Sequence, residues 1–230
     1  MAPAPFARMT PYGTEHLVVL ALTAVAAVLL VRWARRTPAE RLDLVLRRAG
    51  GVLLVNNLLW ILCGFAPWSW NIDESLPLHF SDALRVLTPI ALITRARWAV
   101  AVSWYWGLTL NLQSVLTPDV NFFVWPPLEL AEYWIGHSTA LLAPIVLCWG
   151  CGFRPTWRAC GLAYAATVGW AGVAFVGNLL SGANYAYLMH APAGPSLLDV
   201  LGPWPWYLLV EAAVIAAVWA AMTWPFTRSG

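Results

Sequence analysis

The sequence predicts an all-α integral membrane protein that crosses the bilayer seven times. Only 10% of its 230 residues are charged and 60% are hydrophobic, whereas a soluble domain carries roughly 25% charged residues. Apolar runs of about 20 residues, the length that crosses the hydrocarbon core, recur along the whole chain. No soluble domain of useful size fits between these runs, so we expect residues 1–230 to form a single transmembrane domain.

Each expected helix is an apolar run that is bounded by Pro, Gly or charged residues. In chain order the runs are 14–34 after Gly13, 46–65 before Pro67, 77–94 from Pro77, 97–116 before Pro118, 127–150 from Pro127, 158–181 before Gly182 and 203–224 from Pro203. Pro77 fits the first turn of its helix, where the missing N–H costs nothing, and Ser75 is the expected N-cap.

The arginines predict the orientation of these helices. All thirteen basic residues are arginines, and most fall in alternate short connections: Arg32, Arg35, Arg36, Arg41, Arg47 and Arg48; Arg95 and Arg97; Arg154 and Arg158; and Arg228. The other connections contain Asp73, Glu74, Asp119, His190 and Asp199 without any basic residue. Basic loops face the cytoplasm, so we expect an outer N-terminus, a cytoplasmic C-terminus and a bacterial plasma membrane location. Arginines that are dispersed in loops also argue against a nucleic-acid partner.

Polar side chains within the expected spans gather in the outward half of the membrane. They are Asn56, Asn57, His79, Ser81, Asp82, Arg85, Asn111, Gln113, Glu129, Glu132, His137, Asn178 and Glu211. Intramembrane polar groups usually face an interior cavity, so this distribution predicts a cavity that opens outward and suits a lipid headgroup or a small polar substrate. The alternative is that some of them, Asn56, Asn111 and Asn178 in particular, only join helices by hydrogen bonds.

The third and fifth helices carry the groups that are best suited to catalysis. Helical spacing places Ser81 and Arg85 on one stripe with Asp82 beside it and His79 within a turn. Asp82 is the expected partner of Arg85, because an unpaired intramembrane charge is costly. Histidine ordinarily titrates near neutrality and is the usual general base for a hydroxyl, which makes His137 the candidate base.

The four cysteines, Cys63, Cys148, Cys151 and Cys160, are too few and too dispersed for a disulfide framework, so packing is the expected role. A zinc site could be built from His79, Asp82 and His137 with Ser81 or Glu132 as the fourth ligand. The chain lacks a second close His pair, however, so we expect no metal or other cofactor.

Several motifs together resemble the YwaF-like family of bacterial integral membrane proteins, which is related to eukaryotic transmembrane protein 164. They are Pro77-Leu78-His79-Phe80-Ser81-Asp82, Leu116-Thr117-Pro118-Asp119, His137-Ser138, Asn184-Tyr185-x-Tyr187-Leu188 and Leu201-Gly202-Pro203-Trp204-Pro205-Trp206-Tyr207. For the eukaryotic relatives the resemblance implies acyl transfer on membrane phospholipids by a cysteine of a PLHxC motif and a later histidine. The cysteine position is Ser81 here and the histidine is His137, so the thiol is replaced by a hydroxyl.

Two functions of different classes follow. The first is a lipid acyltransferase or acyl hydrolase with Ser81 as nucleophile, His137 as base and Asp82 as the group that orients the base. Its partner would be a membrane phospholipid or another acyl lipid, bound by His79, Arg85, Glu132, Asn56, Asn111, Gln113, Asn178 and Glu211. The second is a non-enzymatic transporter, lipid-binding receptor or structural membrane protein that uses the same cavity. The sequence shows no paired Gly/Pro helix interruption, which counts against transport.

Overall fold

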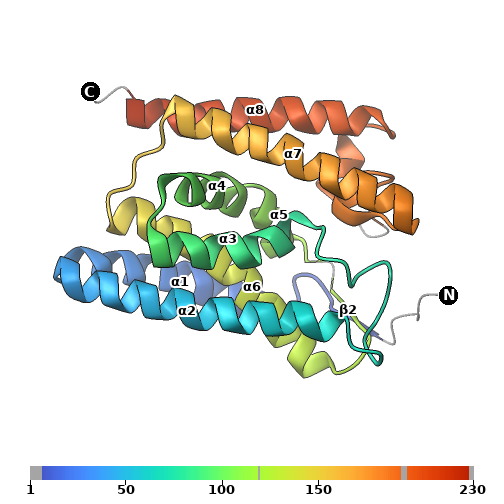
Figure 1. Ribbon diagram of the computed structural model, residues 1–230, viewed down its shortest axis with the longest axis horizontal. Helices are drawn as coiled ribbons and strands as arrows, with labels where there is room; N and C mark the ends of the chain where they lie inside the picture. The colour runs from blue at the N-terminus through green and yellow to red at the C-terminus, as the bar shows by residue number, and fades with distance from the viewer. Residues whose placement is uncertain (1–6, 119, 193–195, 228–230) are drawn as a thin grey trace.

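The computed structural model describes residues 7–118, 120–192 and 196–227 and confirms the all-α prediction (Figure 1). The α-helices are α1 Thr14–Arg36, α2 Ala39–Gly64, α3 Phe80–Thr94, α4 Arg97–Leu108, α5 Leu110–Leu116, α6 Pro126–Ile145, α7 Trp157–Ser181 and α8 Trp206–Thr227. A π-helical turn, Val146–Gly150, extends α6, and two 3-10 turns, Tyr185–Tyr187 and Leu197–Val200, lie between α7 and α8. Two-residue strands, β1 Ala7–Arg8 and β2 Asn121–Phe122, pair in antiparallel fashion.

Four helices in the described part of the chain, α1, α2, α7 and α8, are long and apolar enough to cross a membrane. The protein is therefore multi-pass, but only four of the seven expected spans are shown. The 15 residues of α3 extend over about 22 Å, which is less than the roughly 30 Å of the hydrocarbon core. The expected 97–116 helix is divided into α4 and α5, and α2 begins at Ala39 instead of residue 46.

The helices surround α4 (Figure 1). In that view α1 and α2 run along one edge, α7 and α8 run along the other, and α3, α4 and α5 lie between them. All residues of α4 from Ala99 to Gly107 are buried, which is typical of an apolar helix in the middle of a bundle. One core cluster lies where α1, α2, α3 and α6 meet α4, and a second, rich in aromatic residues, lies between α4, α7 and α8.

The two ends of the bundle differ in charge. The arginine end carries the α1–α2, α3–α4 and α6–α7 connections, where Arg35 donates to the carbonyl oxygen of Trp149 at 2.8 Å and Arg95 lies 3.5 Å from Asp43. The cavity end carries the α2–α3, α5–α6 and α7–α8 connections and the paired strands. Asp119 and Arg228, which also supported the expected orientation, lie outside the described residues.

The break between α4 and α5 corrects the expectation of unbroken helices. Thr109 has φ −128° and ψ −76°. Its hydroxyl donates to the carbonyl oxygen of Tyr105 at 2.5 Å and accepts the indole N–H of Trp219 at 3.0 Å. Thr109 is thus bonded to both α4 and α8 at the point where α4 ends and α5 begins.

Gly107→Ala is expected to destabilise the protein by about 1–3 kcal/mol. A Cβ at Gly107 would collide with the carbonyl oxygen of Ala140, so the close contact of α4 with α6 requires glycine there. Gly169→Ala is the matched control, because nothing lies within 4 Å of a Cβ at that position. Thermal unfolding in detergent measures both, and equal unfolding midpoints for the two variants would contradict the prediction.

Candidate functional site

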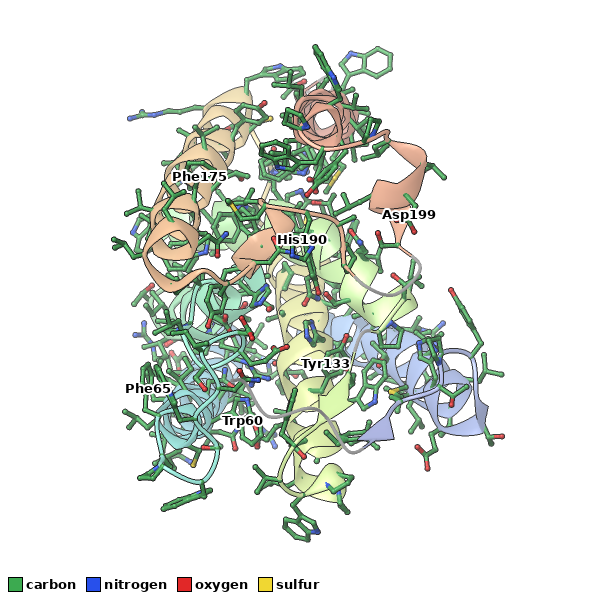
Figure 2. All side chains as sticks on the ribbon, turned by 90° about the vertical axis from the view of Figure 1, so that its right-hand side faces the viewer. Trp60, Phe65, Tyr133, Phe175, His190 and Asp199 are labelled. Carbon is green, nitrogen blue, oxygen red and sulfur yellow. The ribbon has the colours of Figure 1, made fainter. Side chains whose placement is uncertain are left out.

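A cavity of about 880 Å³ opens at the cavity end between α2, α3, α5, α6, α7 and α8. Figure 2 looks at this end, with Tyr133 of α6 near the middle of the view. Eight predicted site residues line the cavity: His79, Ser81, Asp82, Arg85, Asn111, Gln113, His137 and Glu211. Asn56, Glu132 and Asn178 do not line it. Its volume is in the range of small-molecule sites.

The first turn of α3 brings Ser81 to the cavity. The N-cap is His79, with extended backbone, and not Ser75, so Pro77 lies outside the helix. A carboxylate oxygen of Asp82 accepts the backbone N–H of His79 at 2.9 Å. Asp82 therefore caps α3. Its hydrogen bond is made with His79 and not with His137, so the expected role of orienting His137 is not seen. Ser81 becomes the second residue of the helix, half-buried at the cavity wall.

The segment before α3 is fixed by the 3-10 turn Tyr185–Tyr187. His79 Nδ1 accepts the backbone N–H of Ala186 at 3.2 Å, and its ring contacts the rings of Tyr185 and Tyr187 at centroid distances of 5.2 and 5.7 Å. The Tyr185 hydroxyl accepts the N–H of Leu76 at 3.0 Å. Burial raises the pKa of Tyr185 to about 12, so this hydroxyl stays neutral.

Asn178 of α7 secures the same turn. Its side-chain NH₂ donates to the carbonyl oxygen of Tyr185 at 2.9 Å, and its Oδ1 accepts the N–H of Tyr185 at 2.7 Å. With both ends of the amide bonded to backbone and no contribution to the cavity wall, Asn178 joins α7 to the turn, and the expected substrate contact is not seen.

Arg85 forms its ion pair with Glu132 of α6. The expected ion pair with Asp82 is not seen among the described residues. The Arg85 guanidinium donates to the carbonyl oxygen of Glu132 at 2.9 Å and lies 3.7 Å from the Glu132 carboxylate. Asn56 donates to that carboxylate at 3.0 Å, and Asn57 donates to the carbonyl oxygen of Arg85 at 2.7 Å. A Cβ at Gly136 would lie 2.7 Å from Arg85 Cζ, so glycine lets the guanidinium lie against α6. This network joins α2, α3 and α6, which accounts for Glu132 and Asn56 without a substrate.

Asn111 fixes the orientation and tautomer of His137, which is buried. The Asn111 amide donates to the carbonyl oxygen of His137 at 2.9 Å, so its Oδ1 is the atom 2.7 Å from His137 Nδ1. An oxygen of this kind can only accept, and therefore Nδ1 carries the proton. In the neutral ring Nε2 is then an unprotonated acceptor, the form that a general base needs.

Ser81 and His137 line the same cavity from neighbouring helices. Arg85 lies one turn after Ser81 in α3 and contacts Gly136, the residue before His137. His79 and Arg85 are both close enough to His137 to interact with it electrostatically. In the described residues no hydrogen bond joins Ser81 to His137, so the expected direct contact is not seen.

Three tyrosines of the site were not predicted from the sequence. Tyr133 packs on His137 with ring centroids 4.2 Å apart and donates to the carbonyl oxygen of Ser114 at 2.7 Å. It precedes His137 by four residues, a spacing that places both on one helix face. Tyr185 and Tyr187 lie in a loop, where spacing gives no comparable signal.

The proposed metal ligands do not form a metal site. In the described ranges no three His, Cys, Asp or Glu side chains are grouped so that they could hold a metal ion. His79 and His137 are instead bonded to Ala186 and Asn111. The four cysteines are free thiols, of which Cys148 is buried.

Comparison with known proteins identifies the family. The model of the TMEM164 family matches residues 11–223, which include the described helices except the last four residues of α8, and all the residues that line the cavity. No curated protein and no solved structure matches the chain. The match extends over far more than half of the sequence and agrees with the motif resemblance. The chain therefore belongs to the TMEM164 family.

Proposed function

We propose that the protein is a lipid acyltransferase or acyl hydrolase, with Ser81 as nucleophile and His137 as general base. The observation that carries the proposal is the Asn111–His137 pair, which leaves Nε2 of His137 as the basic nitrogen in a cavity that Ser81 also lines. A serine hydroxyl needs such a base more than the thiol of the relatives does, because it is the weaker nucleophile at neutral pH.

The proposed reaction has two halves. In the first, Ser81 Oγ passes its proton to His137 Nε2 and bonds to the ester carbonyl carbon of the lipid. The ester C–O bond then breaks, and the leaving alcohol takes the proton from Nε2. In the second half, water or the hydroxyl of an acceptor lipid attacks the acyl-serine by the same steps in reverse. In the first turn of α3 the N–H groups of Asp82 and Ala83 donate to the carbonyl oxygen of His79, so the backbone N–H groups of Phe80 and Ser81 are the ones that would stabilise the oxyanion.

The membrane arrangement that accompanies this function has seven passes, with the cavity end outside and the arginine end in the cytoplasm. Support comes from the gathering of loop arginines at one end of the bundle. The helices α3, α4 and α5 are too short to span alone, and the irregular segment 65–79 precedes α3. Such backbone is tolerated at membrane depth where it is enclosed by protein or lines a cavity. A bacterial plasma membrane fits this orientation.

Within the cavity wall, His79, Gln113 and Glu211 are the side chains that we propose for contact with the polar part of the lipid. Glu211 lines the cavity from α8, and Ser81 lines it from α3. Arg85 also lines the cavity, although its guanidinium is already bonded to α6.

A fluorophosphonate probe tests the nucleophile, because it forms a stable bond only with an activated serine. We expect the purified protein to be labelled and Ser81→Ala to lose the label. Ser114→Ala is the matched control, since Ser114 also lines the cavity, and it should be labelled as fast as the unchanged protein. Equal labelling of Ser81→Ala and the unchanged protein would disprove the assignment.

A second candidate function is non-enzymatic lipid binding or transport. The helix break at Thr109 favours it, because Leu110 and Asn111 directly after the break line the cavity, and broken helices at binding sites are typical of transporters. If Ser81→Ala and His137→Ala leave the function in cells intact while Gln113→Trp, which fills the cavity, abolishes it, binding without catalysis is favoured.

A further inference from the structure

One face of α8 changes its role along its length. Leu208, Ala212 and Ile215 line the cavity in the half nearer the cavity end. Trp219 and Thr223 continue the same face and are completely buried. The stripe that packs against the protein core in one half of α8 is therefore open to the cavity in the other half.

The facing residues of α7 follow the same pattern. Thr167, Val168 and Ala171 line the cavity, whereas Ala163, deeper in the bundle, is completely buried. Beside the small residues Ala171 and Ala212 the two helices leave a slot with mostly apolar walls. This slot is continuous with the space in front of Ser81, because both belong to one cavity.

The slot ends at a floor made of large side chains. The Tyr164 hydroxyl donates to the carbonyl oxygen of Ala212 at 3.2 Å, and its ring meets the ring of Trp219 edge-on at 6.2 Å. From Trp206, where α8 begins, to Ile215 the helix rises about 14 Å, close to half of the hydrocarbon thickness. The floor therefore lies near the middle of the membrane.

The slot also opens sideways. Val168 lines the cavity and is 59% exposed, and it lies within α7, one of the four helices that can span the membrane. An exposed valine in such a helix faces lipid, so an acyl chain can pass from the bilayer into the slot without crossing water.

We propose that the slot between α7 and α8 binds one acyl chain of a bilayer lipid, and that the Tyr164–Trp219 floor limits its length. The chemistry of the walls fits an alkyl chain, the side opening gives access from the bilayer, and the connection to Ser81 aligns the ester with the nucleophile. The selectivity for reacting chains rests on the proposed function, whereas chain binding requires only the slot.

Ala212→Leu tests the slot, with Ala213→Leu as the matched control, because Ala213 is the next residue of α8 and is exposed on its lipid side. Two readouts are compared: labelling rates with short-chain and long-chain alkyl fluorophosphonates, and mass spectrometry of lipids that copurify. In Ala212→Leu we expect the long-chain rate to fall about tenfold relative to the short-chain rate, the effect of about two methylene groups that lose their apolar site. Ala213→Leu should keep the original ratio.

Ile215→Ala provides a variant in the opposite sense, since it enlarges the slot near its floor, with the exposed Val214→Ala as its control. In this variant long-chain probes should label faster relative to short-chain probes, and longer lipids should copurify. The variant also tests the slot if Ala212→Leu does not fold. If labelling proceeds but the chain-length ratio and copurified lipids are the same in all variants, the slot proposal is wrong and the nucleophile stands. If no probe labels any protein but copurified lipids change in chain length, the slot is supported and the catalytic proposal fails.

Discussion

Replacing Glu132 with leucine is expected to lower the free energy of unfolding by about 3–5 kcal/mol, because it removes the ion-pair partner of the buried Arg85 guanidinium and leaves it only the electrostatic attraction of Asp82. The two side chains are only 9% and 10% exposed, so water cannot take over the role of the carboxylate. The variant also removes the acceptor of Asn56. Denaturation of the purified protein in detergent measures the change.

The double variant Arg85→Met/Glu132→Leu separates the stability that the ion pair contributes from the cost of removing only one of its partners. Replacing a buried ion pair with apolar residues of similar size is often close to neutral, so the double variant should recover much of the stability that Glu132→Leu loses. Asp43→Asn is the control from an exposed pair, since Asp43 lies only 2.6 Å from Arg47 with both side chains in contact with solvent. If Asp43→Asn lowers the free energy of unfolding more than Glu132→Leu does, the distance between the paired charges and not their burial determines the effect.

The sequence predicts where helices occur better than where they begin or break. Apolar runs and flanking arginines lead to the ends of α1 and α7 within two residues and to those of α8 within three, since those helices face lipid over most of their length and composition alone defines them. The start of α3 depends on the Asp82–His79 cap, which competes with an equally plausible Ser75–Pro77 start. At the break Thr109 bonds to Trp219, 110 residues away, and no local pattern encodes that contact.

In the candidate site, too, the residues are easier to predict from the sequence than the contacts that they make. Eight of the residues selected by type and expected depth in the membrane line one cavity, which agrees with the high cost of burying polar groups in lipid. The hydrogen-bond and ion-pair partners of the polar residues could not be predicted in this way. Asn56, Asn111 and Asn178 are equivalent in the sequence, but they bond to a carboxylate, a histidine and a backbone turn. Likewise Arg85 has Asp82 three residues away, and yet its ion pair is made across helices with Glu132.

Asn111→Ala is expected to slow fluorophosphonate labelling of Ser81 by roughly tenfold to a hundredfold, the usual effect of removing a partner that orients a functional histidine. Without the amide, the proton of His137 is no longer held on Nδ1 and the ring is free to turn. His137→Ala removes the base itself and should cost more, about 10²- to 10⁴-fold. The measurement is the initial labelling rate of folded protein, normalised to the folded fraction found by size-exclusion chromatography.

Asn111→Asp and Ser114→Ala distinguish positioning from helix packing. The aspartate keeps an oxygen for the Nδ1–H of His137 but loses the donor to the His137 carbonyl oxygen. It should therefore retain faster labelling than the alanine variant even if both are equally destabilised. Ser114 lines the same cavity three residues further along α5, so its alanine variant should label at nearly the original rate. If Asn111→Ala is less stable and yet its folded fraction labels as fast as the unchanged protein, Asn111 only joins α5 to α6, and the support that it gives to His137 as the base is lost.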